Sequence, residues 1–404
     1  MKIIYLHQYF NTPQMSGGTR SYEMARRLVS LGHEVHMITS WREPTDIHGR
    51  LVTEESGIKV YWLPVYYSNK MSFLKRIQAF LKFAGLSAFK AASIRAEVVF
   101  ATSTPLTIVL PAVYAARRLK IPMVFEVRDL WPDLPIAVKA IRGSIPIALA
   151  YRLEKFAYDN AAAIVALSPG MKEGIVRRGY PKENVHIIPN SCDLELFQVP
   201  RSFGEDFRLK YEWLGNRPLV VYTGAFGRIN GVAYLACLAA AVREFAPEVC
   251  FLSVGSGYEF EHVAELANNL GILNENFFMM QEIPKYEIPA LLSAATMATS
   301  LFIDLPEMWA NSANKFFDAL AAGRPIAINY CGWQAALIKK TGAGLVLPPK
   351  DIPQAAQVLI SALKDKKWLD EASAAASELA YTRFDRNKLA KQLENVLLSV
   401  INHK

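Results

Sequence analysis

The residues best suited to chemistry lie in segment 305–328, which predicts a polar loop, a short helix and a strand. Asn311 and Ser312 are typical N-cap residues, and apolar side chains follow them at helical spacing. A helix that starts from a polar loop offers free backbone N–H groups and a positive dipole end, so residues 311–313 suit an anion. Lys315, one turn further on, can add a full positive charge. This joint therefore predicts a site for a phosphate or a similar anion.

Two glycine-rich loops stand at other predicted joints between a strand and a helix. One contains Gly17 and Gly18, and the other contains Gly224 and Gly227. Glycine permits positive φ angles and lets backbone N–H groups come close to a phosphate or a sugar. Ligands of open α/β sheets bind beyond the carboxyl ends of the strands, where these loops are expected. Both loops are therefore candidate binding elements.

Charged residues also follow a strand predicted at 123–127. Glu126, Arg128 and Asp129 stand together in the sequence EVRDLWPD. Charges placed directly after a buried strand indicate the carboxyl edge of a sheet, where functional side chains gather. The alternative is that residues 131–133 only shape a turn.

Strands and helices alternate through both halves of the chain, which predicts an α/β protein with parallel doubly wound sheets. The length of 404 residues favours two domains. Between the halves, in 197–217, apolar residues no longer recur at regular spacing and charged residues are frequent. We therefore interpret this segment as the interdomain linker. The predicted domains are 1–197 and 198–385.

The composition, 52% hydrophobic and 20% charged, is that of a globular protein. The four cysteines have no metal-type spacing and indicate buried thiols in a reducing compartment, so we expect a cytoplasmic protein without a bound metal. No signal peptide is expected, because His7 and Gln8 interrupt the first apolar run. A net charge of +8 favours an anionic partner, which could be nucleic acid, a membrane surface or a phosphorylated substrate.

Segment 71–96 has five basic residues, no acidic residue and many apolar side chains between them. This pattern suits an amphipathic helix that lies on an anionic membrane surface. An ordinary helix of the domain with a solvated basic face explains the pattern equally well.

These motifs together resemble the GT-B glycosyltransferases, specifically the retaining family-4 group that builds bacterial polysaccharides. The run DALAAGRPI, from Asp318, is similar to the family's EAMAxGxPV, although Ala310 stands where the family has another Glu. Segment 312–315 matches a subgroup that has Ser-x-Asn-Lys before this helix. PNSCD at 189–193 is similar to the family's PNGVD. RDLWPD at 128–133 resembles a subgroup that handles N-acetylated deoxyhexosamines such as N-acetylfucosamine.

The resemblance implies two Rossmann-like domains that face each other across a cleft, with a C-terminal helix at 386–404 that returns to the first domain. It implies that Arg228 binds the donor diphosphate. Asn230 stands where the family has a Lys, and we expect Lys315 to supply the missing cation. The residues expected on the donor side are Gly17, Gly18, Gly224, Gly227, Arg228, Gly255, Ser256, Glu282, Ile283, Glu307, Asn311, Ser312, Asn314, Lys315 and Asp318. Those expected on the acceptor side are Gln8, Glu126, Arg128 and Asp129.

The implied reaction is a metal-independent transfer, with retention, of an N-acetylated (deoxy)hexosamine from a UDP-sugar to a saccharide carried on polyprenyl diphosphate. Such a step would serve O-antigen or capsule synthesis and would place the enzyme at the inner face of the cell membrane. Arg228, Lys315 and Asp129 are the expected catalytic residues, and Asp318 is expected to accept hydrogen bonds from the ribose. No cofactor is expected, and front-face attack by the acceptor hydroxyl needs no protein nucleophile.

Three other functions remain in view. A sugar-nucleotide epimerase of the same fold would bind UDP but would need acid and base groups around the sugar, which we cannot place. A basic nucleic-acid-binding protein would fit the charge, but the sequence has no RNA-binding signature, so no nucleic-acid partner is expected. A dehydrogenase would need GxGxxG after a strand, and residues 224–227 do not match that pattern.

Overall fold

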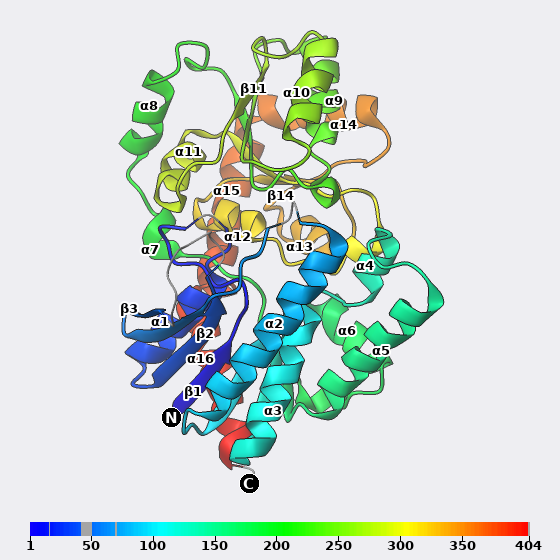
Figure 1. Ribbon diagram of the computed structural model, residues 1–404. Helices are drawn as coiled ribbons and strands as arrows, with labels where there is room; N and C mark the ends of the chain where they lie inside the picture. The colour runs from blue at the N-terminus through cyan, green and yellow to red at the C-terminus, as the bar shows by residue number, and fades with distance from the viewer. Residues whose placement is uncertain (16, 42–50, 69–70, 403–404) are drawn as a thin grey trace. The chain divides into compact units, whose positions relative to one another are not determined.

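The computed structural model describes residues 1–15, 17–41, 51–68 and 71–402 (Figure 1). The chain forms two compact units. Unit 1 comprises Met1–Thr12, Gly17–Pro189 and Asn387–Lys404, and unit 2 comprises Pro13–Ser16 and Asn190–Arg386. The domain boundary expected at 197/198 therefore lies inside unit 2.

Unit 1 is built on an eight-stranded sheet with the order β3-β4-β2-β1-β5-β6-β7-β8. Its pairs are parallel except for β3 with β4, which is antiparallel. The strands are β1 (Lys2–Leu6), β2 (Glu34–Ser40), β3 (Leu51–Glu55), β4 (Ile58–Leu63), β5 (Val98–Thr102), β6 (Met123–Val127), β7 (Ala163–Ala166) and β8 (Val185–Ile187). The helices are α1 (Arg20–Ser30), α2 (Phe73–Ala92), η1 (Leu106–Ile108), α3 (Val109–Leu119), α4 (Asp133–Ala137), α5 (Ser144–Asp159), α6 (Pro169–Arg177), η2 (Lys182–Asn184) and α16 (Arg386–Asn402).

Unit 2 is built on a six-stranded parallel sheet with the order β11-β10-β9-β12-β13-β14. The strands are β9 (Leu219–Thr223), β10 (Cys250–Val254), β11 (Phe277–Met280), β12 (Met297–Ser300), β13 (Ile326–Ile328) and β14 (Gly344–Val346). The helices are α7 (Leu194–Phe197), α8 (Arg201–Leu209), η3 (Arg228–Asn230), α9 (Ala233–Arg243), α10 (Phe260–Asn269), η4 (Lys285–Glu287), α11 (Ile288–Ala294), η5 (Pro306–Met308), α12 (Asn314–Ala321), α13 (Trp333–Thr341), α14 (Ile352–Lys364) and α15 (Lys366–Thr382).

The central strands of both sheets are buried on both faces, which explains why they appear in the sequence as continuous apolar runs. Strand β5 is buried along its whole length, and so is β10. The order of strands in each sheet confirms the predicted doubly wound α/β architecture. The carboxyl ends of the parallel strands in unit 2 lie along one edge, and the loops that follow them carry most of the predicted donor residues.

The interpretation of 197–217 as a linker is wrong. Residues 201–209 form α8, which packs on α11 within unit 2. Gly204 allows the close contact, because a Cβ atom there would lie 2.6 Å from the backbone carbon and oxygen of Ser293. The guanidinium of Arg208 donates two hydrogen bonds to the carbonyl oxygen of Ala294, at 3.0 and 2.6 Å. Arg208, one of the charged residues that interrupt the spacing of apolar residues in 197–217, thus holds helix α8 in place.

Residues 98–116, none of which is charged, form β5, η1 and most of α3. Within the described part of the chain, no helix has both the length and the apolar character needed to cross a membrane.

Candidate functional site

The loop before α12 is held by the side chains that were expected to cap the helix. Helix α12 begins at Asn314 with Ala313 as its N-cap, so the expected start at Asn311 and Ser312 is wrong. The amide of Asn311 donates to the carbonyl oxygen of Met308 at 2.6 Å and accepts from the backbone N–H of Ala313 at 3.2 Å. This local turn competes with the helix, so the positive end of the dipole shifts from 311–313 to about Asn314.

Ser312 forms hydrogen bonds with the loop at Asn190 in the same unit. Its hydroxyl oxygen accepts a hydrogen bond from the backbone N–H of Asn190 at 3.0 Å. The side-chain amide of Asn190 in turn donates to the carbonyl oxygen of Ser312. Asn311 and Ser312 are both buried. Their side chains therefore shape the protein at this point, and their direct contact with a donor stays a prediction.

Lys315 is the most unusual charge in unit 2. Its Nζ atom donates to the hydroxyl of Tyr222 at 3.0 Å and to Oδ1 of Asn230 at 3.2 Å, and it lies 4.4 Å from the centre of the Tyr222 ring. No carboxylate of the described residues forms an ion pair with it. Burial lowers the pKa of Lys315 to about 7. A half-buried cation that has no counter-ion among the described residues is a candidate for binding an anion.

The neighbourhood of Lys315 includes the predicted residue Gly224, Asn230, which was noted only as a departure from the family pattern, and Tyr222, which was not predicted. Asn230 occupies the place where the family resemblance leads us to expect a cation, and the ammonium of Lys315 reaches that place in space. Gly224 leaves room beside Lys315, because a Cβ atom there would lie 3.4 Å from Nζ. Tyr222 was missed, because its position inside a buried strand indicated only core packing. Its hydroxyl donates to the carbonyl oxygen of Ala225 at 2.8 Å, which orients it to accept from Lys315.

Arg228 lies on η3 and is exposed. It makes no hydrogen bond or ion pair with another residue in the described ranges, so its guanidinium is available to a ligand. Gly227, immediately before it, has extended backbone with φ −94°.

The loops after β9, β10 and β11 are joined along the edge of the sheet. The backbone N–H of Gly224 donates to the carbonyl oxygen of Val254, and that of Gly255 donates to Met280. Gly255 has φ +155°, and a Cβ atom there would lie 1.8 Å from the carbonyl oxygen of Gly224, so only glycine fits. The hydroxyl of Ser256 donates to the carboxylate of Glu282 at 2.7 Å. Hydrogen bonds and close backbone contacts therefore link these predicted residues at one edge of the sheet.

Asp318 lies one turn after Lys315 on α12 and is buried. Its Oδ2 atom accepts a hydrogen bond from Nζ of Lys285 at 2.5 Å. Lys285 was not predicted as a site residue, because a contact between residues so far apart in the chain leaves no local pattern. Glu307 lies on η5, where it is half-buried, and makes no hydrogen bond or ion pair with the rest of the described chain. Ile283 and Asn314 are half-buried as well.

In unit 1, Arg128 and Asp129 lie directly after β6 as predicted. Nη1 of Arg128 lies 3.3 Å from Nε2 of His7 at the end of β1. Burial raises the pKa of Asp129, while Arg128 lowers it in part. The side-chain amide of Gln8 is fully buried and has no hydrogen-bond partner among the described residues. Arg128, Asp129 and Gln8 thus gather at the carboxyl edge of the sheet in unit 1.

Glu126 has a different place from the one predicted. Its side chain has no exposure, and Oε1 accepts hydrogen bonds from Nε and Nη2 of Arg20 at 3.1 and 2.8 Å. Oε2 accepts from the hydroxyl of Thr102 at 2.6 Å. Burial opposes ionisation, but Arg20 outweighs it, so the pKa of Glu126 is lowered. Because both oxygens are used inside unit 1, the expected role of Glu126 on the acceptor side is wrong.

The glycine pair in unit 1 has one member that the backbone requires. Gly17 has φ +116°, and a Cβ atom there would lie 2.6 Å from Nδ2 of Asn11. That amide nitrogen also donates to the carbonyl oxygen of Gly18 at 3.3 Å. Asn11, which was missed, therefore supports the exposed loop at Gly17 and Gly18.

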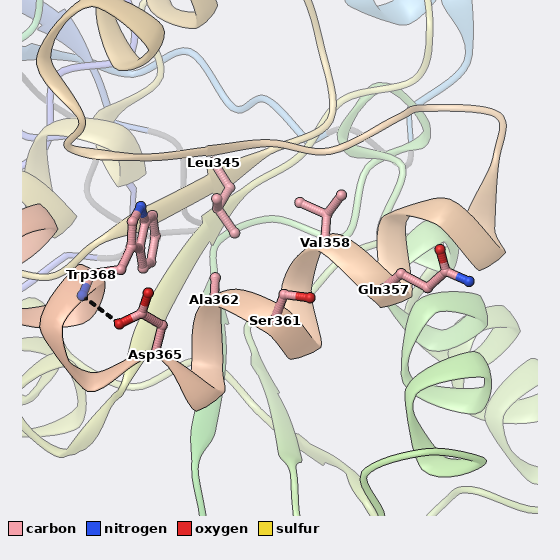
Figure 2. A pocket seen from close by; sticks show the side chains of 7 residues that line it. All are labelled: Leu345, Gln357, Val358, Ser361, Ala362, Asp365 and Trp368. Carbon is pink, nitrogen blue, oxygen red and sulfur yellow. Dashed lines mark hydrogen bonds between the residues drawn. The ribbon is translucent and has the colours of Figure 1, made fainter.

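Two other features of the described residues bear on ligands. No three side chains of His, Cys, Asp or Glu in the described ranges gather closely enough to hold a metal ion. A pocket of about 420 Å³ lies in unit 2, lined by β14, α14 and the start of α15, and it contains none of the predicted donor residues (Figure 2). There the carboxylate of Asp365 caps α15 by accepting from the backbone N–H of Trp368 at 3.0 Å.

Family comparisons match both halves of the chain. Residues 17–191 match a glycosyl transferase 4-like domain, and residues 217–365 match the glycosyl transferases group 1 domain. The chain is 24% identical to the putative colanic acid biosynthesis glycosyl transferase WcaI of Escherichia coli, over 95% of this chain and 97% of that protein.

Solved structures share the fold over the whole chain. Sucrose-phosphate synthase from Thermosynechococcus elongatus has a TM-score of 0.82 at 18% identity, with 100% of both chains covered. Anabaena Alr3699/HepE in complex with UDP-glucose has a TM-score of 0.73 at 16% identity, with 99% of this chain and 100% of that chain covered. At these identities the likeness establishes the fold.

Proposed function

We propose that the chain, whose two halves match a glycosyl transferase 4-like domain and the glycosyl transferases group 1 domain, is a GT-B glycosyltransferase. It transfers an N-acetylated (deoxy)hexosamine, with retention, from a UDP-sugar to a lipid-linked saccharide. The acceptor would be carried on polyprenyl diphosphate, and the product would enter a bacterial surface polysaccharide such as O-antigen or capsule. The relative named for colanic acid biosynthesis supports a role in polysaccharide synthesis. The solved complex of HepE with UDP-glucose supports a uridine nucleotide as the leaving group.

The observation that carries this proposal is the ammonium of Lys315, which has no carboxylate partner among the described residues. A diphosphate leaving group develops negative charge as the bond to the sugar breaks, and a cation held in place before the reaction stabilises that charge. Lys315 lies beside Gly224 and near the start of α12, with the exposed guanidinium of Arg228 on η3 of the same unit. We assign Lys315 and Arg228 to the diphosphate and Asp318 to the ribose hydroxyls.

We assign the other predicted donor-side residues to the base and the donor sugar by their positions in unit 2. The loop of Glu282 and Ile283 after β11 would bind the base, and Glu307 and Asn314 would bind the donor sugar. The acceptor would meet unit 1 at Arg128 and Asp129, with the amide of Gln8 as a further hydrogen-bonding group. Front-face attack by the acceptor hydroxyl, with the leaving phosphate taking its proton, completes a retaining reaction without a metal.

The test is calorimetric titration of the wild-type protein with UDP, GDP and NAD in buffer that contains a metal chelator. We expect binding of UDP alone, followed by transfer from UDP-N-acetylhexosamines to a polyprenyl diphosphate-linked acceptor. Binding of GDP instead would change the donor, and no binding of any nucleotide would contradict the proposal. Turnover of the UDP-sugar without an acceptor would favour an epimerase.

We also propose that unit 1 binds an anionic membrane surface through α2, which would place the enzyme at the inner face of the cell membrane. Leu74, Leu81 and Phe89 lie along one stripe of this helix and are 71%, 55% and 69% exposed. Lys75 and Lys82 are exposed beside them. Apolar anchors next to basic side chains are typical of helices that lie in the headgroup region. Helix α2 packs beside α3 (Figure 1).

Sedimentation with vesicles of neutral and anionic lipid tests this surface. We expect binding to anionic vesicles only, and a loss of binding when Leu81→Ser and Phe89→Ser are combined. Leu209→Ser is the matched control, because Leu209 is an exposed apolar residue of unit 2. Equal binding of the double variant and the control would contradict the assignment.

A further inference from the structure

Lys285 connects two parts of the proposed nucleoside site. It begins η4, directly after the loop at 281–284 to which we assign the base. Its Nζ atom lies 2.5 Å from Oδ2 of Asp318, the residue that we assign to the ribose. A single side chain therefore joins the base loop to helix α12 inside unit 2.

The ammonium of Lys285 is held on two sides. Besides its contact with the carboxylate, Nζ lies 4.8 Å from the centre of the Phe197 ring, and Phe197 is buried on α7. The side chains of Lys285 and Asp318 are only 22% and 9% exposed. Water screens such a pair less than an exposed one, so the contact constrains the direction of the carboxylate.

The contact leaves part of the carboxylate for a ligand. An ionised carboxylate has two oxygens with about four acceptor positions, and Lys285 occupies one of them on Oδ2. No described residue donates a hydrogen bond to Oδ1. A neighbouring pair of hydroxyl groups, such as the 2′ and 3′ hydroxyls of a ribose, can use the remaining positions.

We propose that Lys285 is a positioning residue for ribonucleoside recognition, acting through Asp318. Lys285 fixes the carboxylate of Asp318 so that its free positions meet the ribose hydroxyls, and it ties the base loop to that carboxylate. The inference rests on the proposed donor, a uridine nucleotide. A site built to bond a hydroxyl rejects the analogue that lacks it, so Lys285 sharpens the choice of ribose over 2′-deoxyribose.

A double-mutant cycle tests whether Lys285 acts through Asp318. Lys285→Met, Asp318→Asn and the double variant are titrated with UDP and with 2′-deoxy-UDP in the full chain. We expect Lys285→Met to weaken UDP binding by about tenfold, because the ribose loses one hydrogen bond to a carboxylate held in a fixed direction. The same change should affect 2′-deoxy-UDP binding much less. In the Asp318→Asn background, Lys285→Met should have no further effect on UDP.

Two further variants make the test specific. Lys285→Arg keeps a cation that can reach the carboxylate and should restore most of the preference for UDP. Lys367→Met is the matched control, because Lys367 pairs with Glu371 on the surface of α15 in the same unit. Thermal unfolding of each variant shows whether it is folded, and Lys285→Gln replaces Lys285→Met if the latter is not.

The outcomes separate this inference from the proposed function. Wild-type binding of UDP with an unchanged ratio of UDP to 2′-deoxy-UDP affinity in Lys285→Met would overturn the role of Lys285 and leave the donor intact. Additive effects in the cycle would show that Lys285 does not act through Asp318, which also overturns it. Absence of UDP binding by the wild type would overturn both.

Discussion

Replacement of Lys315 by Met should weaken donor binding and stabilise the fold at the same time. Met keeps the length of the Lys side chain and removes its charge. The charge interacts with the hydroxyl of Tyr222 and the amide oxygen of Asn230, and no carboxylate of the described residues compensates it. A residue that serves only the fold would not be expected to show this combination.

The magnitude for binding follows from the charge. A hydrogen bond between an ammonium and a phosphate oxygen contributes about 1.5–3 kcal/mol. A loss of about 3 kcal/mol corresponds to roughly a hundredfold weaker binding. We therefore expect Lys315→Met to raise the Kd for UDP by between ten- and a hundredfold, at about pH 6, where the wild-type side chain is charged.

The magnitude for stability follows from burial. Burial lowers the pKa of Lys315 from 10.5 to about 7, and each pKa unit corresponds to about 1.4 kcal/mol. Because the folded pKa is below the unfolded one, the charge destabilises the fold fully below pH 7, and the cost fades as the pH rises towards 10.5. The cost is on the order of 5 kcal/mol, and the variant loses two hydrogen bonds of about 1 kcal/mol each. A net gain of roughly 3 kcal/mol in the free energy of unfolding remains at low pH.

Urea unfolding and calorimetry with UDP measure the two effects on the same samples. The stability gain should disappear when unfolding is repeated near pH 10, whereas a gain from better apolar packing would persist. Unchanged UDP affinity, or a variant less stable than the wild type below pH 7, would refute the reasoning about Lys315.

Three further predictions concern the titration of Lys315, the ion pair of Glu126 and the close contact at Gly204. The wild-type Kd for UDP should rise about tenfold per pH unit above pH 7 as Lys315 loses its proton. Lys315→Arg should remove this pH dependence, because arginine stays charged. If titrations give the wild type and Lys315→Arg the same pH dependence of Kd, the assignment of Lys315 is contradicted. Glu126→Gln should cost about 3–5 kcal/mol in urea unfolding, because it removes the negative charge that faces the buried guanidinium of Arg20. Since the pKa of Glu126 is lowered, the cost should be seen near neutral pH and should shrink as the pH falls through that pKa. Gly204→Ala should destabilise unit 2 by forcing α8 away from α11. The control Gly85→Ala, on the open surface of α2, should stabilise the protein by about 0.5–1 kcal/mol. Similar shifts of the melting temperature for both variants would argue against the close contact at Gly204.

The sequence was most informative where one local pattern determined the structure. Strand β6 has the expected bounds, 123–127, because it is a short apolar run that ends in a polar turn. The edge strand β3 was not predicted, since it is antiparallel and its side chains alternate between half-buried and exposed. Helix α8 was missed for a related reason, because only Gly204 and Phe207 of its residues are buried.

The same distinction between local patterns and tertiary contacts applies to the residues of the candidate site. The placement of Lys315 and Asp318 on neighbouring turns of one helix could be predicted because both belong to one motif, and their roles toward the donor stay predictions. The partners Tyr222 and Lys285 come from other elements, and only tertiary packing brings them to α12. Glu126 was misassigned because a carboxylate at the end of a strand has the same sequence pattern whether it faces a ligand or a buried Arg20.

The return of α16 to unit 1 has a consequence for the order of folding during translation. Nε of Arg27 donates to the side-chain oxygen of Asn387 at 2.7 Å, and Nε2 of His33 lies 2.8 Å from the carboxylate of Glu394. The ribosome makes the partners of α1 only after the whole of 190–386 has been made. Unit 2 can therefore complete its sheet while unit 1 still lacks its last helix. A nascent chain released before Asn387 would leave the surface under α16 open to chaperones and proteases.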